Sequence, residues 1–166
     1  MYGGMVVMKV LVMSDTHGYI ANARRAIEKN PEVEIIIHLG DYCRDVADLE
    51  QLYPNKRFEY VYGNSDFGVG EIESEKTLEL EGRRIFLTHG HKYSVKWDIS
   101  RIIAKAEMEN AQIALYGHTH IALVEQVCDC MILNPGSISE SRSDLSESYA
   151  ILNITPEKID AEFFYI

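Results

Sequence analysis

The sequence predicts an α/β fold in which two β-sheets pack as a sandwich with helices on the outside. Three observations predict it: short apolar runs rich in β-branched residues, helical patterns between the first of these runs, and successive strand-like runs after about residue 120. Strands that alternate with helices indicate a mainly parallel sheet, and strands joined by turns indicate a second, more antiparallel sheet. No linker or low-complexity segment divides the chain, so we expect one domain over residues 1–166.

Nine apolar runs are predicted as strands. The first five are short, and each ends at a polar cluster with Gly, Asp, Asn or His, which is typical of the end of a buried strand. They cover residues 8–13, 33–39, 58–62, 84–87 and 112–116. The other four are linked by turns such as Cys128-Asp129 and cover residues 121–127, 131–133, 149–154 and 159–165.

Three segments have helical periodicity. The first, 22–29, ends before Pro31, and the second, 45–53, ends before Pro54 and begins with Asp45 as a plausible N-cap. The third covers 95–109 and places five apolar residues on one face. These are Val95, Ile99, Ile102, Ile103 and Ala106. We interpret all three apolar stripes as core packing.

Composition and charge exclude several classes of protein. The 16 Lys and Arg against 26 Asp and Glu leave a net charge of −10, which disfavours non-specific binding to nucleic acid or to an anionic membrane. Cys43, Cys128 and Cys130 are too few, and odd in number, for a disulfide scaffold. The N-terminus lacks the basic start of a signal peptide, and no window suits a membrane span. We expect a cytoplasmic protein.

Polar residues gather where the first five predicted strands end. Their spacing returns each cluster to the same edge of a sheet, where ligands bind in open α/β folds. They are Asp15, His17, Asp41, Asn64, His89, His118 and His120. A single Asp-x-His or His-x-His is more often a loop cap or a hydrogen-bonded histidine, but five such clusters together predict a metal centre.

The candidate ligands indicate the kind of metal. Carboxylate, imidazole and amide groups without thiolate suit Mn²⁺, Fe²⁺, Zn²⁺, Co²⁺ or Ni²⁺ better than a closed structural zinc site. Seven candidates exceed the needs of one tetrahedral ion and suit two ions that share a ligand. Asp41 is the natural shared ligand, because a carboxylate has two oxygens.

The motifs also resemble a known family. Their order along the chain is Asp15-Thr16-His17-Gly18, Gly40-Asp41, Gly63-Asn64-Ser65-Asp66, Thr88-His89-Gly90-His91, Gly117-His118-Thr119-His120 and Asn134-Pro135-Gly136-Ser137. This set resembles the calcineurin-like metallophosphoesterase superfamily, and in its short length the YfcE-like phosphodiesterase branch. The resemblance covers nearly the whole chain. It implies a four-layer α/β/β/α sandwich of two mixed β-sheets with a two-metal site at its rim.

The resemblance also implies roles for single residues. One divalent transition-metal ion would be held by Asp15, His17, Asp41 and His120. The other would be held by Asp41, Asn64, His89 and His118. Asp41, Asn64 and His118 are the predicted catalytic residues. We expect Mn²⁺, with Fe²⁺, Zn²⁺, Ni²⁺ or Co²⁺ as alternatives.

The expected function is hydrolysis of a small-molecule or nucleotide-type phosphodiester by a metal-bridging water or hydroxide. The alternative is a non-catalytic protein-interaction scaffold on the same fold, like the retromer subunit of the superfamily. A homo-oligomer is expected in either case, with no membrane partner.

Several residues keep two interpretations. Ser65 follows Asn64 where many members of the superfamily have a histidine, and Ser65 cannot act as a strong acid at neutral pH. Asp66 either orients a ligand histidine or caps a turn. His91 lies two residues from His89 and could touch the site. Arg142 belongs either to a solvated loop or to a contact with a substrate phosphate. His38, inside an apolar run, is interpreted as a hydrogen-bonded core histidine.

Overall fold

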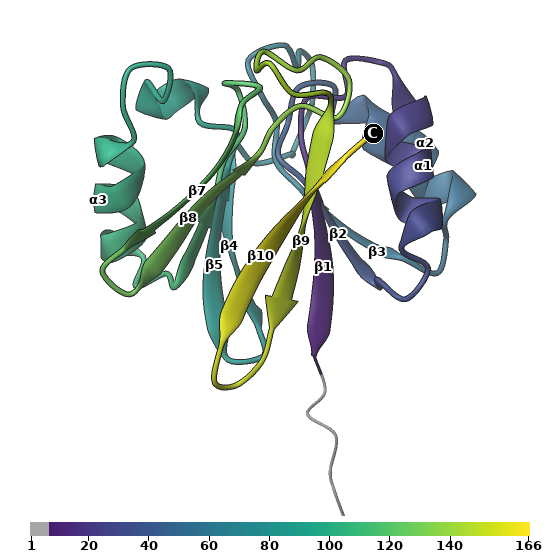
Figure 1. Cartoon of the computed structure of the whole chain (residues 1–166). Coiled ribbons are helices and arrows are strands. Elements are labelled where there is room, and N and C mark those ends of the chain that lie inside the picture. The colour runs from purple at the N-terminus through teal and green to yellow at the C-terminus, as the bar shows by residue number, and fades with distance from the viewer. Residues whose placement is uncertain (1–6) are drawn as a thin grey trace, which may run out of the picture.

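Two mixed five-stranded sheets pack face to face in the computed structural model, which describes residues 7–166. Helices α1 (Ile20–Lys29) and α2 (Arg44–Leu52) cover the outer face of one sheet, and α3 (Ser100–Met108) covers the outer face of the other (Figure 1). The predicted sandwich with outer helices, and the four-layer arrangement, are confirmed. Among residues 7–166, no helix is long and apolar enough to cross a bilayer.

The first sheet has the strand order β10-β9-β1-β2-β3. β1 pairs in parallel with β2, β2 pairs in parallel with β3, and β9 pairs antiparallel with both β1 and β10. The bounds are β1 Met8–Met13, β2 Ile35–His38, β3 Arg57–Tyr60, β9 Ser148–Ile154 and β10 Ile159–Tyr165.

The second sheet has the order β4-β5-β6-β8-β7. β5, β6 and β8 are parallel neighbours, and the edge strands β4 and β7 are antiparallel to their partners. The bounds are β4 Glu75–Leu80, β5 Arg83–Thr88, β6 Ile113–Leu115, β7 Ala122–Val127 and β8 Cys130–Pro135.

The distribution of strands between the sheets corrects the prediction. We expected the strands after residue 120 to form the antiparallel sheet, but β7 and β8 join the second sheet whereas β9 and β10 join the first. The periodicity of a strand reports which faces are buried, not which neighbour it pairs with. β4 was not predicted, because its sequence Glu-Lys-Thr-Leu-Glu-Leu is mostly polar and half-buried.

The helix boundaries also differ from the prediction. α1 begins at Ile20, and α2 begins at Arg44 with Cys43 as its N-cap residue, so Asp45 is not the cap. Asp45 is buried instead and accepts a hydrogen bond from the amide of Gly18 at 2.8 Å. α3 begins only at Ser100, and Val95 is buried from the loop before it.

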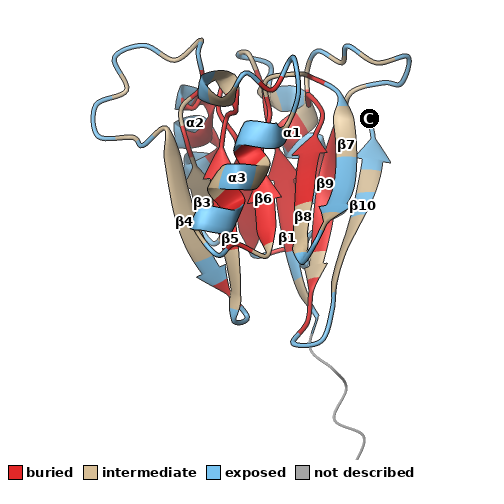
Figure 2. Cartoon of the chain, turned by 90° about the vertical axis from the view of Figure 1, so that its left-hand side faces the viewer, coloured by how far each residue is buried: buried red, intermediate tan, exposed pale blue. Residues whose placement is uncertain are grey.

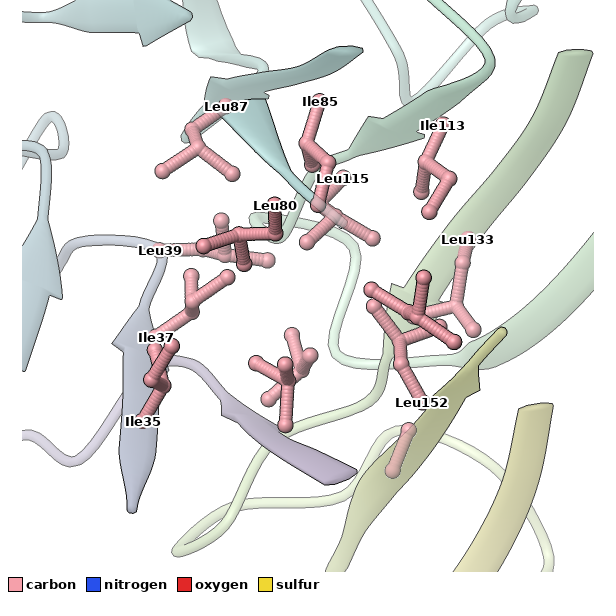
Figure 3. Packing of buried hydrophobic residues seen from close by; sticks show 14 of the residues in the cluster. Ile35, Ile37, Leu39, Leu80, Ile85, Leu87, Ile113, Leu115, Leu133 and Leu152 are labelled. Atoms are coloured by element: carbon pink, nitrogen blue, oxygen red, sulfur yellow. The ribbon is translucent and has the colours of Figure 1, made fainter. Parts of the chain in front are cut away.

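The main core lies between the two sheets. Leu39, directly after β2 of the first sheet, and Leu87 and Leu115 of the second sheet are among the buried side chains that meet there (Figure 3). Two further clusters lie under α1 and α2 and under α3. Figure 2 shows buried central strands behind α3, whose outward face is exposed. This packing fixes the strand ends, and with them the loops that follow β1, β2, β3, β5 and β6.

Candidate metal centre

The structure brings the seven predicted site residues together. They lie in the loops that follow β1, β2 and β3 of the first sheet and β5 and β6 of the second, at the top of the view in Figure 1. Their ligand atoms form two groups, and within each group the atoms lie within 4.8 Å of one another. One group is Asp15, His17 and His120, and the other is Asp41, His89 and His118. Asn64 joins the second group, with Oδ1 3.2 Å from His89 Nε2.

In the first group, two imidazole nitrogens converge on a buried carboxylate. His120 Nε2 lies 3.1 Å from Asp15 Oδ1, and His17 Nε2 lies 3.4 Å from His120 Nε2. Asp15 Oδ1 is buried and accepts no hydrogen bond from residues 7–166. A buried carboxylate oxygen without a partner is costly, and a cation beside it would remove that cost.

In the second group, His89 is central. Its Nε2 lies 3.2 Å from His118 Nδ1 and 3.4 Å from Asp41 Oδ1. His118 is half-buried and His89 fully buried. The group thus places two imidazole nitrogens, a carboxylate and an amide oxygen around one point, a donor set that suits a divalent transition metal.

Backbone carbonyls fix the tautomers of two histidines. His89 Nδ1 donates to the carbonyl of Leu39 at 2.7 Å, and His120 Nδ1 donates to the carbonyl of Glu140 at 2.7 Å. In a neutral imidazole the other nitrogen, Nε2, then carries a lone pair. Both lone pairs face carboxylates, an arrangement that is repulsive without a cation and typical of metal-binding histidines. The residues therefore fit divalent metal ions.

Asp41 faces both groups. Its Oδ1 lies near His89, as above, and its Oδ2 lies 3.8 Å from His17 Nε2. Ser65 holds the carboxylate, since its amide donates to Oδ1 at 2.8 Å and its hydroxyl donates to Oδ2 at 3.2 Å. This orientation supports the prediction that the two oxygens divide between two ions.

Unusual backbone conformations bring these side chains together. Asp15, His17, Asp41, His118 and His120 all have positive φ angles between 47° and 70°. Such angles are uncommon outside glycine and cost about 1 kcal/mol or more each, so they persist only where the surrounding structure enforces them. Their concentration in these five loop residues is typical of a functional site.

Two glycines leave room for the carboxylates. A Cβ on Gly63 would lie 2.1 Å from Asp41 Oδ1, and a Cβ on Gly117 would lie 2.1 Å from Ser14 Oγ. Ser14 in turn donates a 2.5 Å hydrogen bond to Asp15 Oδ2. Any side chain at either glycine would therefore displace a candidate ligand or its support.

The Asn-Pro-Gly-Ser segment is not the tight β-turn that its Pro and Gly predict, because Asn134 and Pro135 are the last residues of β8; the segment supports the site instead. Ser137 Oγ and Ser139 Oγ donate to the carbonyl of Asp15 at 3.0 and 2.7 Å. Asn134 Nδ2 donates to the carbonyl of Gly117 at 3.0 Å. This segment therefore fixes the loops that carry Asp15 and His118. No role of Ser139 could be predicted from the sequence, because a serine in a polar loop has no periodic or spacing signal.

The open interpretations of Asp66 and His91 are now decided by geometry. Asp66 accepts hydrogen bonds from the amides of Cys43 and Gly63, both at 2.8 Å, so it caps loops rather than orienting a ligand histidine. His91 is in neither ligand group, although its ring centroid lies 5.4 Å from that of His89.

His38 is the hydrogen-bonded core histidine that the sequence predicts. Its Nδ1 accepts from the amide of Gly40 at 3.1 Å, and its Nε2 contacts Thr16 Oγ1 at 3.0 Å. Because Nδ1 accepts, the proton of the neutral ring is on Nε2. Cys128-Asp129 forms the predicted turn between β7 and β8.

The pKa shifts of Asp15 and His118 favour their metal-binding forms, whereas the shift of His17 favours its protonated form, in which a proton takes the place of a cation. Burial would raise the pKa of Asp15, but the neighbouring imidazoles of His120, His17 and His89 outweigh it and hold that pKa well below its usual range. Contact with Asp15 raises the pKa of His17. Burial lowers the pKa of His118 to about 4, with further contributions from His89 and Lys96. At neutral pH Asp15 is thus ionised and His118 neutral, as metal ligation requires.

Comparison with known proteins decides the family. The model of the calcineurin-like phosphoesterase superfamily domain matches residues 8–157. The chain belongs to this superfamily. It is 33% identical over 159 residues to a probable metallophosphoesterase of Bacillus subtilis, covering 95% of this chain and 90% of the relative. It is 32% identical over 146 residues to a phosphodiesterase of Methanocaldococcus jannaschii, covering 78% and 83%.

Solved structures agree with this assignment. A predicted phosphoesterase from Streptococcus pneumoniae superposes with a TM-score of 0.83 at 28% identity, over 97% of this chain and 91% of that one. The zinc complex of Vps29 from Entamoeba histolytica superposes with a TM-score of 0.73 at 20% identity, over 95% and 98%. The second likeness concerns the fold alone.

Proposed function

We propose that this member of the superfamily is a metal-dependent phosphodiesterase that acts on a small-molecule or nucleotide-type phosphodiester. The observation that carries the proposal is the pair of ligand groups that meet at Asp41, with Asp15 in one group and His89 in the other. The phosphodiesterase of M. jannaschii supports the reaction class.

The proposed metal content is two divalent ions, with Mn²⁺ preferred. Asp15, His17, Asp41 and His120 would hold one, and Asp41, Asn64, His89 and His118 would hold the other. When bound, such ions supply a Lewis acid for the phosphoryl oxygens and make a water molecule acidic enough to attack at neutral pH. Asp15 and Asp41 contribute only two negative charges against four positive ones, so the loaded site attracts an anionic substrate despite the net charge of −10.

The residues of the chain itself limit the leaving group. Ser65, which occupies the position after Asn64, donates its hydroxyl proton to Asp41 Oδ2 and is not placed to protonate a departing alkoxide. With no strong acid at this position, the leaving group must depart largely as an anion. We therefore expect diesters with acidic leaving groups, such as aryl esters, to react faster than alkyl monoesters.

The proposal is tested by hydrolysis assays on chelated and Mn²⁺-loaded protein. We expect bis(p-nitrophenyl) phosphate to be cleaved only by the loaded protein, and faster than an alkyl monoester. Asp41→Asn keeps the size of the side chain but removes its charge, and should lower the rate at least about 100-fold. Equal activity of the chelated and loaded protein would contradict the proposal.

A second candidate function is a non-catalytic scaffold, which the likeness in fold to Vps29 favours. The same metal titration separates the two candidates. No binding of any divalent ion together with no hydrolysis would favour the scaffold, whereas binding with hydrolysis favours the enzyme.

A further inference from the structure

A cleft of about 430 Å³ opens directly beside the candidate metal centre. Two of the candidate ligands, His17 and Asn64, line one side of it. The rest of its wall is lined by Tyr42, Arg44, Ser65, Asp66, Phe67 and Val69. A phosphodiester whose phosphoryl group lies at the metal centre must place at least one ester group in such a neighbouring space.

Arg44 presents to this cleft a guanidinium that forms no ion pair with the described residues, although the carboxylate of Asp66 also lines the cleft. Its guanidinium carbon lies 4.5 Å from the centroid of the Tyr42 ring, and that ring packs against His17 with centroids 5.4 Å apart. Among residues 7–166, no carboxylate lies within 4.0 Å of the Arg44 guanidinium, whereas Arg57 pairs with Glu59 at 2.6 Å. The stack on Tyr42 orients the guanidinium, and its planar donor fork suits two oxygens of a phosphoryl group.

Phe67 gives the cleft an exposed aromatic wall. It lies in the loop between β3 and β4, three residues after Asn64, and 89% of its surface is exposed. A large apolar side chain left uncovered in a substrate cleft is suited to cover an apolar part of the ligand. Together with Tyr42 it offers ring faces on which a flat group can stack.

We propose that Arg44 binds a phosphoryl oxygen of the substrate and that Phe67 and Tyr42 accept an aromatic ester group, such as an aryl or nucleobase-bearing group. This inference rests on the proposed function and narrows the substrate class to diesters with one aromatic ester group. Arg142, the phosphate contact considered from the sequence, lines another pocket with Lys96 and Thr119, and none of the seven candidate ligands lines that pocket.

The test uses two diesters with the same leaving group. Phenyl p-nitrophenyl phosphate and methyl p-nitrophenyl phosphate both release p-nitrophenolate and carry one negative charge, so they differ mainly in the group that the cleft would hold. We expect Mn²⁺-loaded wild-type protein to favour the phenyl ester in kcat/KM by about tenfold, as an aromatic contact predicts. Phe67→Ala should remove most of this preference, and Phe67→Tyr should keep it. Trp97→Ala is the matched control, because Trp97 is also 89% exposed.

Arg44 should act on both substrates alike. Arg44→Gln should lower kcat/KM by about ten- to a hundredfold for each ester, and Arg44→Lys should restore only part of it, because Lys lacks the planar fork. Calorimetric titration with phenylphosphonate and methylphosphonate, which are not hydrolysed, should show the same two effects in Kd. Phe67→Ala should remove the preference for the phenyl compound, and Arg44→Gln should weaken the binding of both compounds. Arg25→Gln, an exposed arginine of α1, is the charge-matched control.

The outcomes separate this inference from the proposed function. Hydrolysis of neither ester by the wild-type protein with any divalent ion would contradict the proposed function itself. Hydrolysis that is unaffected by Arg44→Gln, or reduced instead by Arg142→Gln, would overturn the role of Arg44. An unchanged phenyl-to-methyl ratio in Phe67→Ala would overturn the aromatic subsite.

Discussion

The Nδ1 atom of His89 lies 2.7 Å from the carbonyl oxygen of Leu39, so a residue after β5 is oriented by the strand end of the opposite sheet. The contact leaves the Nε2 lone pair of His89 aimed at Asp41, Asn64 and His118. The second ligand group thus depends on how the two sheets are placed against each other, and on one imidazole tautomer.

His89→Gln should abolish metal binding at the second group and lower diesterase activity at least about 100-fold. The shorter amide cannot both donate to the carbonyl of Leu39 and present a metal ligand where Nε2 lies. Metal content by mass spectrometry and activity check this. His91→Gln is the neighbouring control, since His91 belongs to neither ligand group. If His91→Gln costs as much as His89→Gln, the assignment of ligands in this motif is wrong.

Gly63→Ala should displace Asp41 and with it weaken metal binding at both groups. The added Cβ would lie 2.1 Å from Asp41 Oδ1 and 2.6 Å from its backbone nitrogen, which is closer than real contacts allow. Gly82→Ala, in the turn between β4 and β5, meets no atom within 4 Å but has a φ of +72°. It should cost about 1 kcal/mol of stability and no metal affinity. Calorimetric metal titration compares the two variants, and equal affinities would refute the steric argument.

Asp66→Ala should loosen the loops that carry Asn64 and Cys43. It leaves two backbone amides without their acceptor, which should cost about 1–3 kcal/mol in urea unfolding of the chelated protein and about tenfold in metal affinity. Asp98→Ala also removes a carboxylate that accepts a backbone amide hydrogen bond, from Ser100 at 2.8 Å, but the hydrogen bonds of Asp98 are to Ser100 and not to a candidate ligand. It should reduce stability without changing metal affinity. A metal affinity unchanged in Asp66→Ala would show that Asp66 is not needed to hold the site.

His38 should make the stability of the chelated protein depend on pH. Burial lowers the pKa of His38 to about 4, whereas an exposed histidine of the unfolded chain has a pKa of about 6.5. A proton on Nδ1 would also oppose the amide of Gly40. The contribution of neutral His38 to the free energy of unfolding is therefore fully present above pH 6.5. It is lost as the pH falls toward 4, because the unfolded state then binds a proton that the folded state does not. The loss amounts to about 3 kcal/mol.

The variant His38→Asn isolates this effect, because its Oδ1 can still accept from Gly40. The difference in the free energy of unfolding between wild-type and variant protein should shrink as the pH falls from 7 to 4. Denaturant titrations at several pH values measure it. A difference that does not change with pH would mean that His38 takes up its proton equally in both states.

Much of the fold could be predicted because apolar periodicity reports burial directly. The strand 8–13 matches β1, and the last strand, 159–165, matches β10. Pairing between strands could not be predicted, because β5 and β9 have similar apolar patterns yet join different sheets. The same holds for Asp45, whose partner Gly18 is remote in sequence.

The candidate ligands could be located because each follows a strand whose end is evident in the sequence. The positive φ angles of Asp15 and Asp41, and the shape of the cleft beside them, could not, because they arise from contacts between loops that the chain order separates. Arg44 has no spacing signal either, because only the fold places it beside Phe67 and Asn64 of another loop in one cleft.

The most direct test of the central claim is anomalous scattering from crystals of the Mn²⁺-loaded protein. We expect two peaks, one in contact with Asp15, His17 and His120 and one in contact with Asn64, His89 and His118, with an oxygen of Asp41 beside each. A single peak, or peaks away from these side chains, would contradict a shared two-metal centre in this chain.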